Sequence, residues 1–175
     1  MTLRYGSTHL ATITGGSMDD VTVARATHIV FVVLWIGGVG FVTTVLLPAI
    51  RNLKAPEQTA FFHAIEQRFA WQARISTGLV GLTGLYMLGR LDLWDRFLYG
   101  AYWWMHAMVA VWLLFTVMLF VAEPLILHRW LHARAEVEPE RTYRRVEWLH
   151  RILLIASLIT VFGAVAGSHG LLLFE

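Results

Sequence analysis

The chain alternates between long apolar runs without charge and short segments that carry most of its charged residues. The four uncharged runs contain 25, 15, 26 and 23 residues, at positions 26–50, 75–89, 97–122 and 152–174. A helix needs about 20 residues to cross a hydrocarbon core of about 30 Å. Three runs are long enough, and the second qualifies when residues 69–71 extend it and Arg74 snorkels or faces inward. The pattern predicts four transmembrane helices, at approximately residues 20–50, 69–90, 97–123 and 150–174.

These runs indicate an all-α fold, a four-helix membrane bundle that forms one domain over residues 1–175. Lipid offers no partner to an open sheet edge, and the runs lack the alternation of a barrel strand. Residues 1–17 do not resemble a signal peptide, and Ser17 with Asp20 predicts that the first helix starts near Met18. Between spans one and two, Pro56 opens a segment with apolar residues at helical spacing. This segment is predicted to be a short interfacial helix.

Composition supports the membrane assignment, because 57% of the residues are hydrophobic and only 15% are charged. A soluble protein of this size needs a more polar surface than 26 charged residues in a few segments supply. The absence of cysteine excludes disulfides, thiolate metal sites, iron–sulfur clusters and covalently attached c-type haem. The net charge of +2 gives no argument for nucleic acid as a partner.

The distribution of Lys and Arg predicts the orientation. Four of them lie at the termini and in the loop between spans two and three, and the other ten lie in the remaining loops and their flanks. The basic side is expected in the cytoplasm. Both termini then face the periplasm of a bacterial inner membrane, which the chain crosses several times. The predicted outer interface carries an aromatic belt of Trp94, Tyr99, Tyr102, Trp103 and Trp104, and the glycines at 78, 81, 84, 163, 167 and 170 predict close helix contact.

Three histidines are predicted to lie at a similar depth in the outer half of the spans: His28, His106 and His169. Ionisable side chains within a span are costly and usually face the bundle interior. A neutral imidazole can coordinate a metal with one nitrogen while the other donates to a carbonyl or hydroxyl. His28 and His106, on two helices, therefore predict the two axial ligands of one haem b, an arrangement that favours electron transfer.

Other residues complete this hypothesis or compete with it. Arg25 and Arg96 could pair with haem propionates, or simply snorkel. His169 is a weaker ligand candidate near a predicted helix end, and all three histidines could instead hold helices together by hydrogen bonds. His63 and His150 could bind a second haem, but their positions beside loops favour solvated surface residues. Glu123 could relay protons to a quinone site, although helix capping or an interfacial position is favoured.

Copper is the alternative metal, because imidazole and thioether ligands suit Cu(I) and Met105, His106 and Met108 are close in sequence. Residues three apart share a helix face only in part, and methionine is common in apolar cores. The sequence contains neither a nucleophilic triad nor a paired-carboxylate site in the spans, so catalytic residues stay unknown.

The residues His28 to Gly38, followed by Leu47 to Arg51, resemble the first helix of CopD-like copper-resistance membrane domains. They are also similar to HemJ-type protoporphyrinogen oxidases, whose Trp-Leu-His-x-Lys pattern looks like Trp104 to Met108 here. The resemblance implies a four-helix membrane protein with haem b near His28 and His106. Met108 stands where the HemJ pattern has lysine, and this departure puts porphyrinogen oxidation in doubt.

The expected function is that of a b-type cytochrome of the inner membrane, with one haem or two. It would carry electrons between a periplasmic carrier and the quinone pool, as a subunit of a larger redox complex or as its partner. Copper transport of the CopD kind and a HemJ-like oxidase activity are the alternatives, and whether the chain is an enzyme stays open. The only partner that composition itself establishes is membrane lipid.

Overall fold

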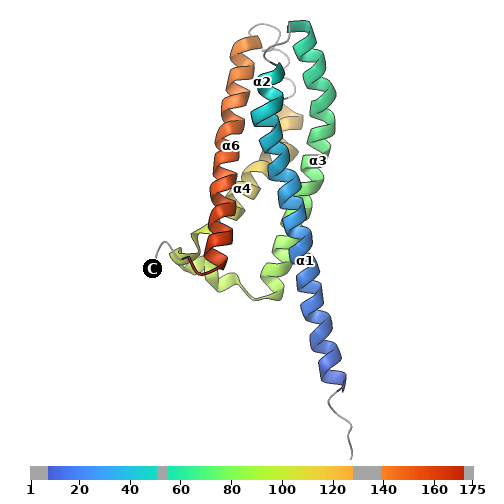
Figure 1. Cartoon of the computed structure of the whole chain (residues 1–175), viewed down its shortest axis with the longest axis vertical. Helices are drawn as coiled ribbons and strands as arrows, with labels where there is room; N and C mark the ends of the chain where they lie inside the picture. The colour runs from blue at the N-terminus through green and yellow to red at the C-terminus, as the bar shows by residue number, and fades with distance from the viewer. Residues whose placement is uncertain (1–7, 51–54, 128–138, 172–175) are drawn as a thin grey trace, which may run out of the picture.

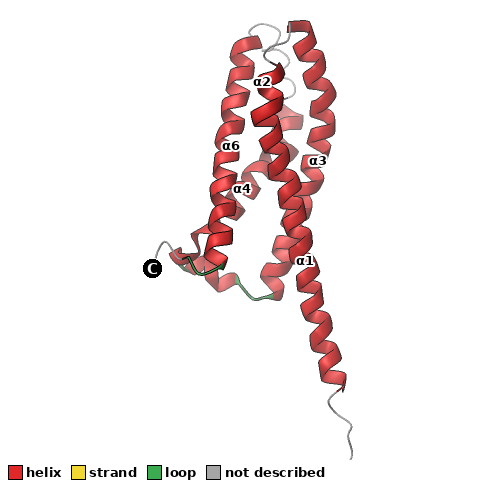
Figure 2. Cartoon of the chain, viewed as in Figure 1, coloured by secondary structure: helices red, strands yellow, loops and turns green. Residues whose placement is uncertain are grey.

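The computed structural model describes residues 8–50, 55–127 and 139–171, and these are helical except for short turns (Figure 2). Two long helices are interrupted by wider π-helical segments, and two 3-10 turns join the second helix to the third. The elements are α1 (Thr8–Phe41), the π-helix η1 (Val42–Leu46), α2 (Leu47–Ile50), α3 (Ala55–Arg90), the 3-10 turns η2 (Trp94–Leu98) and η3 (Gly100–Tyr102), α4 (Trp103–Val117), the π-helix η4 (Met118–Leu127) and α6 (Pro139–Ser168).

The long helices pack as a bundle in which α1 lies along α3 and α4 lies along α6 (Figure 1). Smaller contacts between α1 and α6 and between α3 and α4 close the ring. All four helices contribute to the central apolar cluster, which contains Trp35, Val39, Val80, Phe115 and Leu153. The N-terminal part of α1 extends beyond the connection between α3 and α4 (Figure 1).

Three segments are long and apolar enough to cross a membrane: Met18–Ile50, Gly100–Glu123 and Arg144–Ser168. The outer faces of the bundle are apolar, since Val33, Leu82 and Phe162 are 64%, 66% and 67% exposed. Ser157 and Thr160, by contrast, are buried, and their hydroxyl groups donate to carbonyls four residues earlier. Apolar outer faces with hydroxyl groups inside are typical of helices surrounded by lipid.

Two predicted helix boundaries in the N-terminal half of the chain are wrong. The predicted interfacial helix is not a separate element, because α3 runs without a break from Ala55 to Arg90. Proline occurs only in its first turn, at Pro56, where a missing N–H costs nothing, and none follows to end the helix. Likewise α1 begins at Thr8 and not near Met18. Gly15 and Gly16 weaken a helix but do not end it.

The predicted glycine contacts are confirmed at several positions, and the neighbour in each case is an aromatic ring. A Cβ added at Gly163 would overlap the ring of Trp103, and one at Gly167 would overlap Trp104. Of these two tryptophans, which the sequence places in an interfacial belt, Trp104 is buried and so faces inward, whereas Trp103 is half-buried against α6. Their neighbours Trp94 and Tyr99 are exposed, as a belt requires.

Both π-helical segments have a proline close by. In a π-helix each carbonyl pairs with the N–H five residues later, as Val42 does with Leu47. The next such pair in η1 would join Thr43 to Pro48, and the corresponding pair in η4 would join Leu119 to Pro124. Proline has no N–H, so neither of these two pairs can form. The wider turns lie at the end of the bundle that carries α2, called here the α2 end.

Candidate functional site

His28 is held against α3 through one ring nitrogen. Its Nδ1 lies 3.1 Å from the carbonyl oxygen of Val80 and 3.0 Å from Oγ1 of Thr83. A carbonyl can only accept, so Nδ1 carries the hydrogen and donates it. The Thr83 hydroxyl donates in turn to Leu79, at 2.6 Å. Within the described residues Nε2 has no hydrogen-bond partner, so the ring presents an unused lone pair.

The backbone of α3 leaves space for this imidazole at Gly84. A Cβ at that position would stand 3.3 Å from Cε1 of His28. Glycine therefore lets the edge of the ring approach the helix while Nδ1 reaches the Val80 carbonyl one turn earlier. A fixed tautomer with one donated N–H and one unused nitrogen is the usual state of a metal-ligating histidine.

His106, the other predicted axial ligand, is bonded to the turn that precedes α4. Its side chain is exposed, and Nε2 donates to the Phe97 carbonyl at 3.0 Å. The ring also meets the Phe97 ring edge-on, with centroids 5.2 Å apart. In the described part of the chain no hydrogen bond or ring contact joins His106 to His28. His28 is held on α3, against which α1 mainly packs, whereas His106 is held on the turn before α4, which packs mainly on α6, and their joint ligation of one haem stays a prediction.

His169 lies at the predicted helix end. The α6 helix closes there with Gly170 at φ 93° and a bond from the Leu171 N–H to the Ala166 carbonyl, which together form a Schellman motif. The Nδ1 of His169 donates to the Val165 carbonyl at 2.8 Å, and the residue is exposed. Its Nε2 has no hydrogen-bond partner among the residues described, which is the same state as in His28.

The two arginines predicted to meet propionates are both exposed. Arg25 lies one turn before His28 on α1. Arg96 places its guanidinium 5.1 Å from the centre of the Tyr102 ring, a cation–π contact. Met105 is buried whereas its neighbour His106 is exposed, so the two side chains have different surroundings on α4, and the copper alternative stays a prediction. Among the side chains that the structure describes, no three His, Asp or Glu residues cluster as a metal site.

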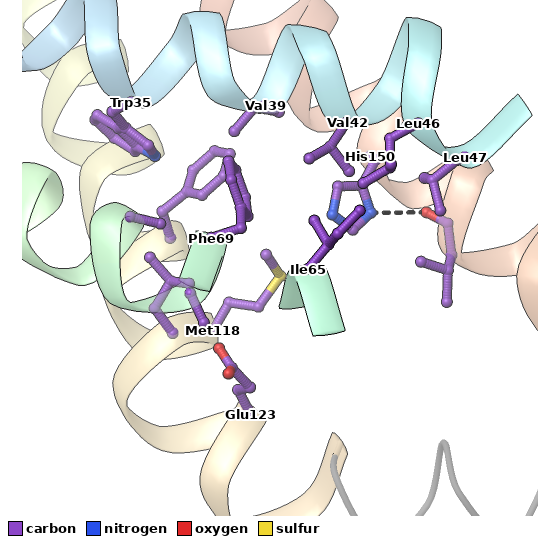
Figure 3. Close-up of a pocket in the computed structure, with 15 residues that line it drawn as sticks. Trp35, Val39, Val42, Leu46, Leu47, Ile65, Phe69, Met118, Glu123 and His150 are labelled. Carbon is purple, nitrogen blue, oxygen red and sulfur yellow. Dashed lines mark hydrogen bonds between the residues drawn. The ribbon is translucent and has the colours of Figure 1, made fainter. Parts of the chain in front are cut away.

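A cavity of about 110 Å³ lies in the bundle interior near the α2 end (Figure 3). The helices α1, α3, α4 and α6 and the segments η1, α2 and η4 all contribute to its wall. The wall is mostly apolar, with Phe69, Phe115 and Met118 among its larger side chains. Its three most polar members are Trp35, Glu123 and His150.

Trp35 and His150 each bring an unused hydrogen-bonding atom to the cavity. Trp35 is only 4% exposed, and its buried Nε1–H has no partner in the described structure. The Nδ1 of His150 donates to the Val146 carbonyl at 2.9 Å, which leaves Nε2 as an acceptor. In Figure 3, Nε2 lies on the side of the His150 ring that faces the other residues of the cavity wall. The prediction that His150 is a solvated surface residue is therefore wrong.

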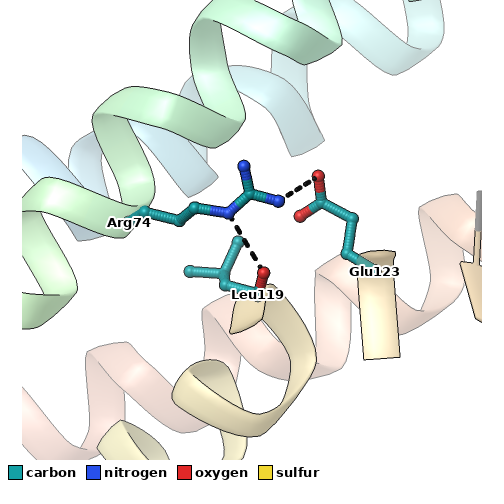
Figure 4. A network of polar contacts seen from close by, with 3 residues as sticks. All are labelled: Arg74, Leu119 and Glu123. Carbon is teal, nitrogen blue, oxygen red and sulfur yellow. Dashed lines mark hydrogen bonds and ion pairs between the residues drawn. The ribbon is translucent and has the colours of Figure 1, made fainter. Parts of the chain in front are cut away.

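Glu123 stands at the edge of the cavity and is paired with Arg74 (Figure 4). Nη2 of Arg74 lies 3.1 Å from Oε1 of Glu123, and Nε donates to the Leu119 carbonyl at 3.1 Å. This is the carbonyl whose partner five residues later, Pro124, has no N–H to donate. Arg74 thus faces inward, one of the two alternatives predicted for it, and Glu123 is its ion-pair partner, a role that the sequence interpretation, which favoured helix capping or an interfacial position, did not include.

The sequence contained signals for this second site. An arginine in span two and a glutamate in span three, both near the predicted cytoplasmic ends, are opposite charges at one depth. Two prolines at the same ends of spans one and three marked the interrupted helices. The side chains of His9, His63, His128 and His132 lie outside those that the structure describes, so the predicted pairing of His63 with His150 has no structural outcome.

Comparisons with family models, with curated proteins and with solved structures give no match for this chain.

Proposed function

We propose that the chain is a four-span membrane protein, in which α3 crosses the membrane in addition to the three segments named above. Its outward-facing Ile75, Leu82 and Leu85 are exposed and apolar, and its one charged residue at mid-helix, Arg74, is paired inside the bundle. A paired, inward-facing arginine is how charge is accommodated within a membrane. The charge distribution of the loops then favours the cytoplasm for the α2 end and the periplasm for both termini of a bacterial inner membrane.

Within that bundle we propose a haem b site that serves electron transfer, with His28 as an axial ligand. The observation that carries this proposal is the state of the His28 ring, with Nδ1–H donated to Val80 and Nε2 unused. Haem bound there would supply a one-electron iron couple. The chain's own part is to fix the tautomer and orientation of the imidazole through Val80 and Thr83, and to surround it with apolar side chains.

The donor chemistry fits this group at His28. For the opposite axial position His169 ranks ahead of His106, because its Nε2 is unused whereas that of His106 is bonded to Phe97. His106 would have to turn away from Phe97 before it could ligate. Arg25, exposed one turn from His28, is the better placed arginine for a propionate, since Arg96 is engaged with Tyr102. Electron exchange would run between a periplasmic partner and the quinone pool.

The test is an absorption spectrum of the detergent-purified protein, first oxidised and then reduced with dithionite. The proposal expects a sharp α band typical of haem b, and its loss in His28→Ala. Gly84→Leu, which crowds the ring without removing it, is expected to lower haem content as well. His132→Ala, in the loop between the third and fourth predicted spans, is the control and should keep the band.

The same measurement on His106→Ala and His169→Ala identifies the second ligand. Loss of the low-spin spectrum in His169→Ala alone is the expected result. A wild-type protein without an α band, or a His28→Ala variant whose spectrum is unchanged, would reject the haem assignment.

A further inference from the structure

We propose that the cavity near the α2 end binds the ring of a membrane quinone, with Trp35 as hydrogen-bond donor and His150 as acceptor. This inference rests on the proposed electron-transfer function, since it names the site at which the chain would meet the quinone pool. It depends on a different part of the molecule, because the cavity wall includes neither His28 nor His106 nor His169.

The size of the cavity limits its occupant to a single ring. An apolar cavity of about 150 Å³ holds one benzene molecule, and pockets for drug-sized ligands run from about 300 Å³. At about 110 Å³ this space is smaller than that benzene cavity and excludes a porphyrin, so a single ring lies in it only in part and extends through its open side. Because it lies within the apolar bundle, a molecule that is already dissolved in the bilayer reaches it most easily.

The polar atoms of the wall specify the chemistry of that ring. The indole N–H of Trp35 is buried without a partner, and burying an unpaired donor is costly. A ligand that accepts a hydrogen bond from it removes that cost. The tautomer of His150 is fixed by the Val146 carbonyl, so its Nε2 can only accept. The matching ligand accepts at one oxygen and, when reduced, donates from another, as a quinol does.

The edge of the cavity supports this occupant. Ile65, Phe69, Met118 and His150 are only partly buried, so the cavity borders the surface and a hydrocarbon tail could leave between them. The Glu123 carboxylate beside them is held by Arg74 at 3.1 Å. An apolar wall with a donor and an acceptor from different helices is the general form of a small-ligand site.

The experiment measures equilibrium binding of decylubiquinone and its reduced form to the purified full-length protein in detergent, by dialysis. Wild-type protein is expected to bind in a saturable manner. Trp35→Phe, which keeps the ring but removes the N–H, should weaken binding of both forms about tenfold. Ala73→Leu, which fills the cavity from α3, should abolish it. Trp71→Phe makes the same change as Trp35→Phe on an exposed face and should leave binding unchanged.

His150→Leu separates hydrogen bonding from a purely structural role. Because Nε2 accepts only from a hydroxyl group, this variant should weaken binding of the reduced form more than that of the oxidised form. Absence of saturable binding in the wild type would overturn the proposal. Equal affinity in wild type, Trp35→Phe and Ala73→Leu would also overturn it and leave ordered water as the occupant. If Ala73→Leu does not fold, Trp35→Phe and His150→Leu still decide.

The two proposals can fail independently. His28→Ala should lose the haem spectrum and keep quinone binding, whereas Trp35→Phe should keep the spectrum and lose affinity. A protein that binds the quinone but shows no α band would retain the quinone site and lose the haem assignment.

Discussion

Gly81→Ala is expected to destabilise the protein, whereas Gly78→Ala, three residues earlier on the same helix, is expected to stabilise it. A Cβ at Gly81 would overlap the ring of Trp112, and no other atom lies within 4 Å of one at Gly78. Trp112 cannot simply move aside, because its Nε1 donates to the Thr77 carbonyl at 2.9 Å. Overpacking costs about 1–3 kcal/mol and the lost hydrogen bond about 1 kcal/mol more.

The control, Gly78→Ala, is expected to change stability in the opposite direction for a reason that is local to the helix. Alanine is favoured over glycine in a helix interior by roughly 1 kcal/mol when nothing obstructs the methyl group. Thermal unfolding in detergent should therefore place the midpoint of Gly81→Ala roughly 10 °C below the wild type, and that of Gly78→Ala slightly above. Equal shifts of the same sign in both variants would show that Trp112 does not pack into Gly81.

The helices could be predicted because the four uncharged runs are long and the charged residues fall between them. Their boundaries could not, because a helix continues wherever the backbone allows it. The stretch from Pro56 to Phe69 contains no residue that ends a helix, so α3 absorbs it. The packing of Trp104 against Gly167 was also beyond a linear pattern, since it depends on how α4 and α6 rotate about their axes.

The candidate sites, like the helices, could be predicted from the sequence only in part. The importance of His28 followed from an ionisable side chain within a long apolar run, and the structure gives that residue a carbonyl partner on α3. Depth alone placed His106 beside it, but depth does not fix the direction in which a side chain points around its helix. His150 was assigned to the surface from its proximity to a loop. Only the tertiary structure shows it half-buried in the wall of a cavity.

Arg74→Met is expected to destabilise the protein by about 2 kcal/mol, because one side chain supplies two contacts across the bundle. It removes the ion pair with Glu123 and the hydrogen bond from Nε to the Leu119 carbonyl. The expected cost is below that of a fully buried pair, since the two side chains are 28% and 21% exposed. Arg68→Met, on the exposed face of the same helix, should change stability by less than about 0.5 kcal/mol.

Glu123→Gln separates the two contacts, because it removes the charge but leaves an oxygen that can still accept from Arg74. We expect a smaller loss than in Arg74→Met, about 1 kcal/mol, and a double variant whose loss is less than the sum of the two. The measurement is again thermal unfolding in detergent. If the losses of Arg74→Met and Glu123→Gln simply add, the ion pair contributes nothing. The whole effect of Arg74 would then come from the carbonyl of Leu119, which Pro124 cannot satisfy.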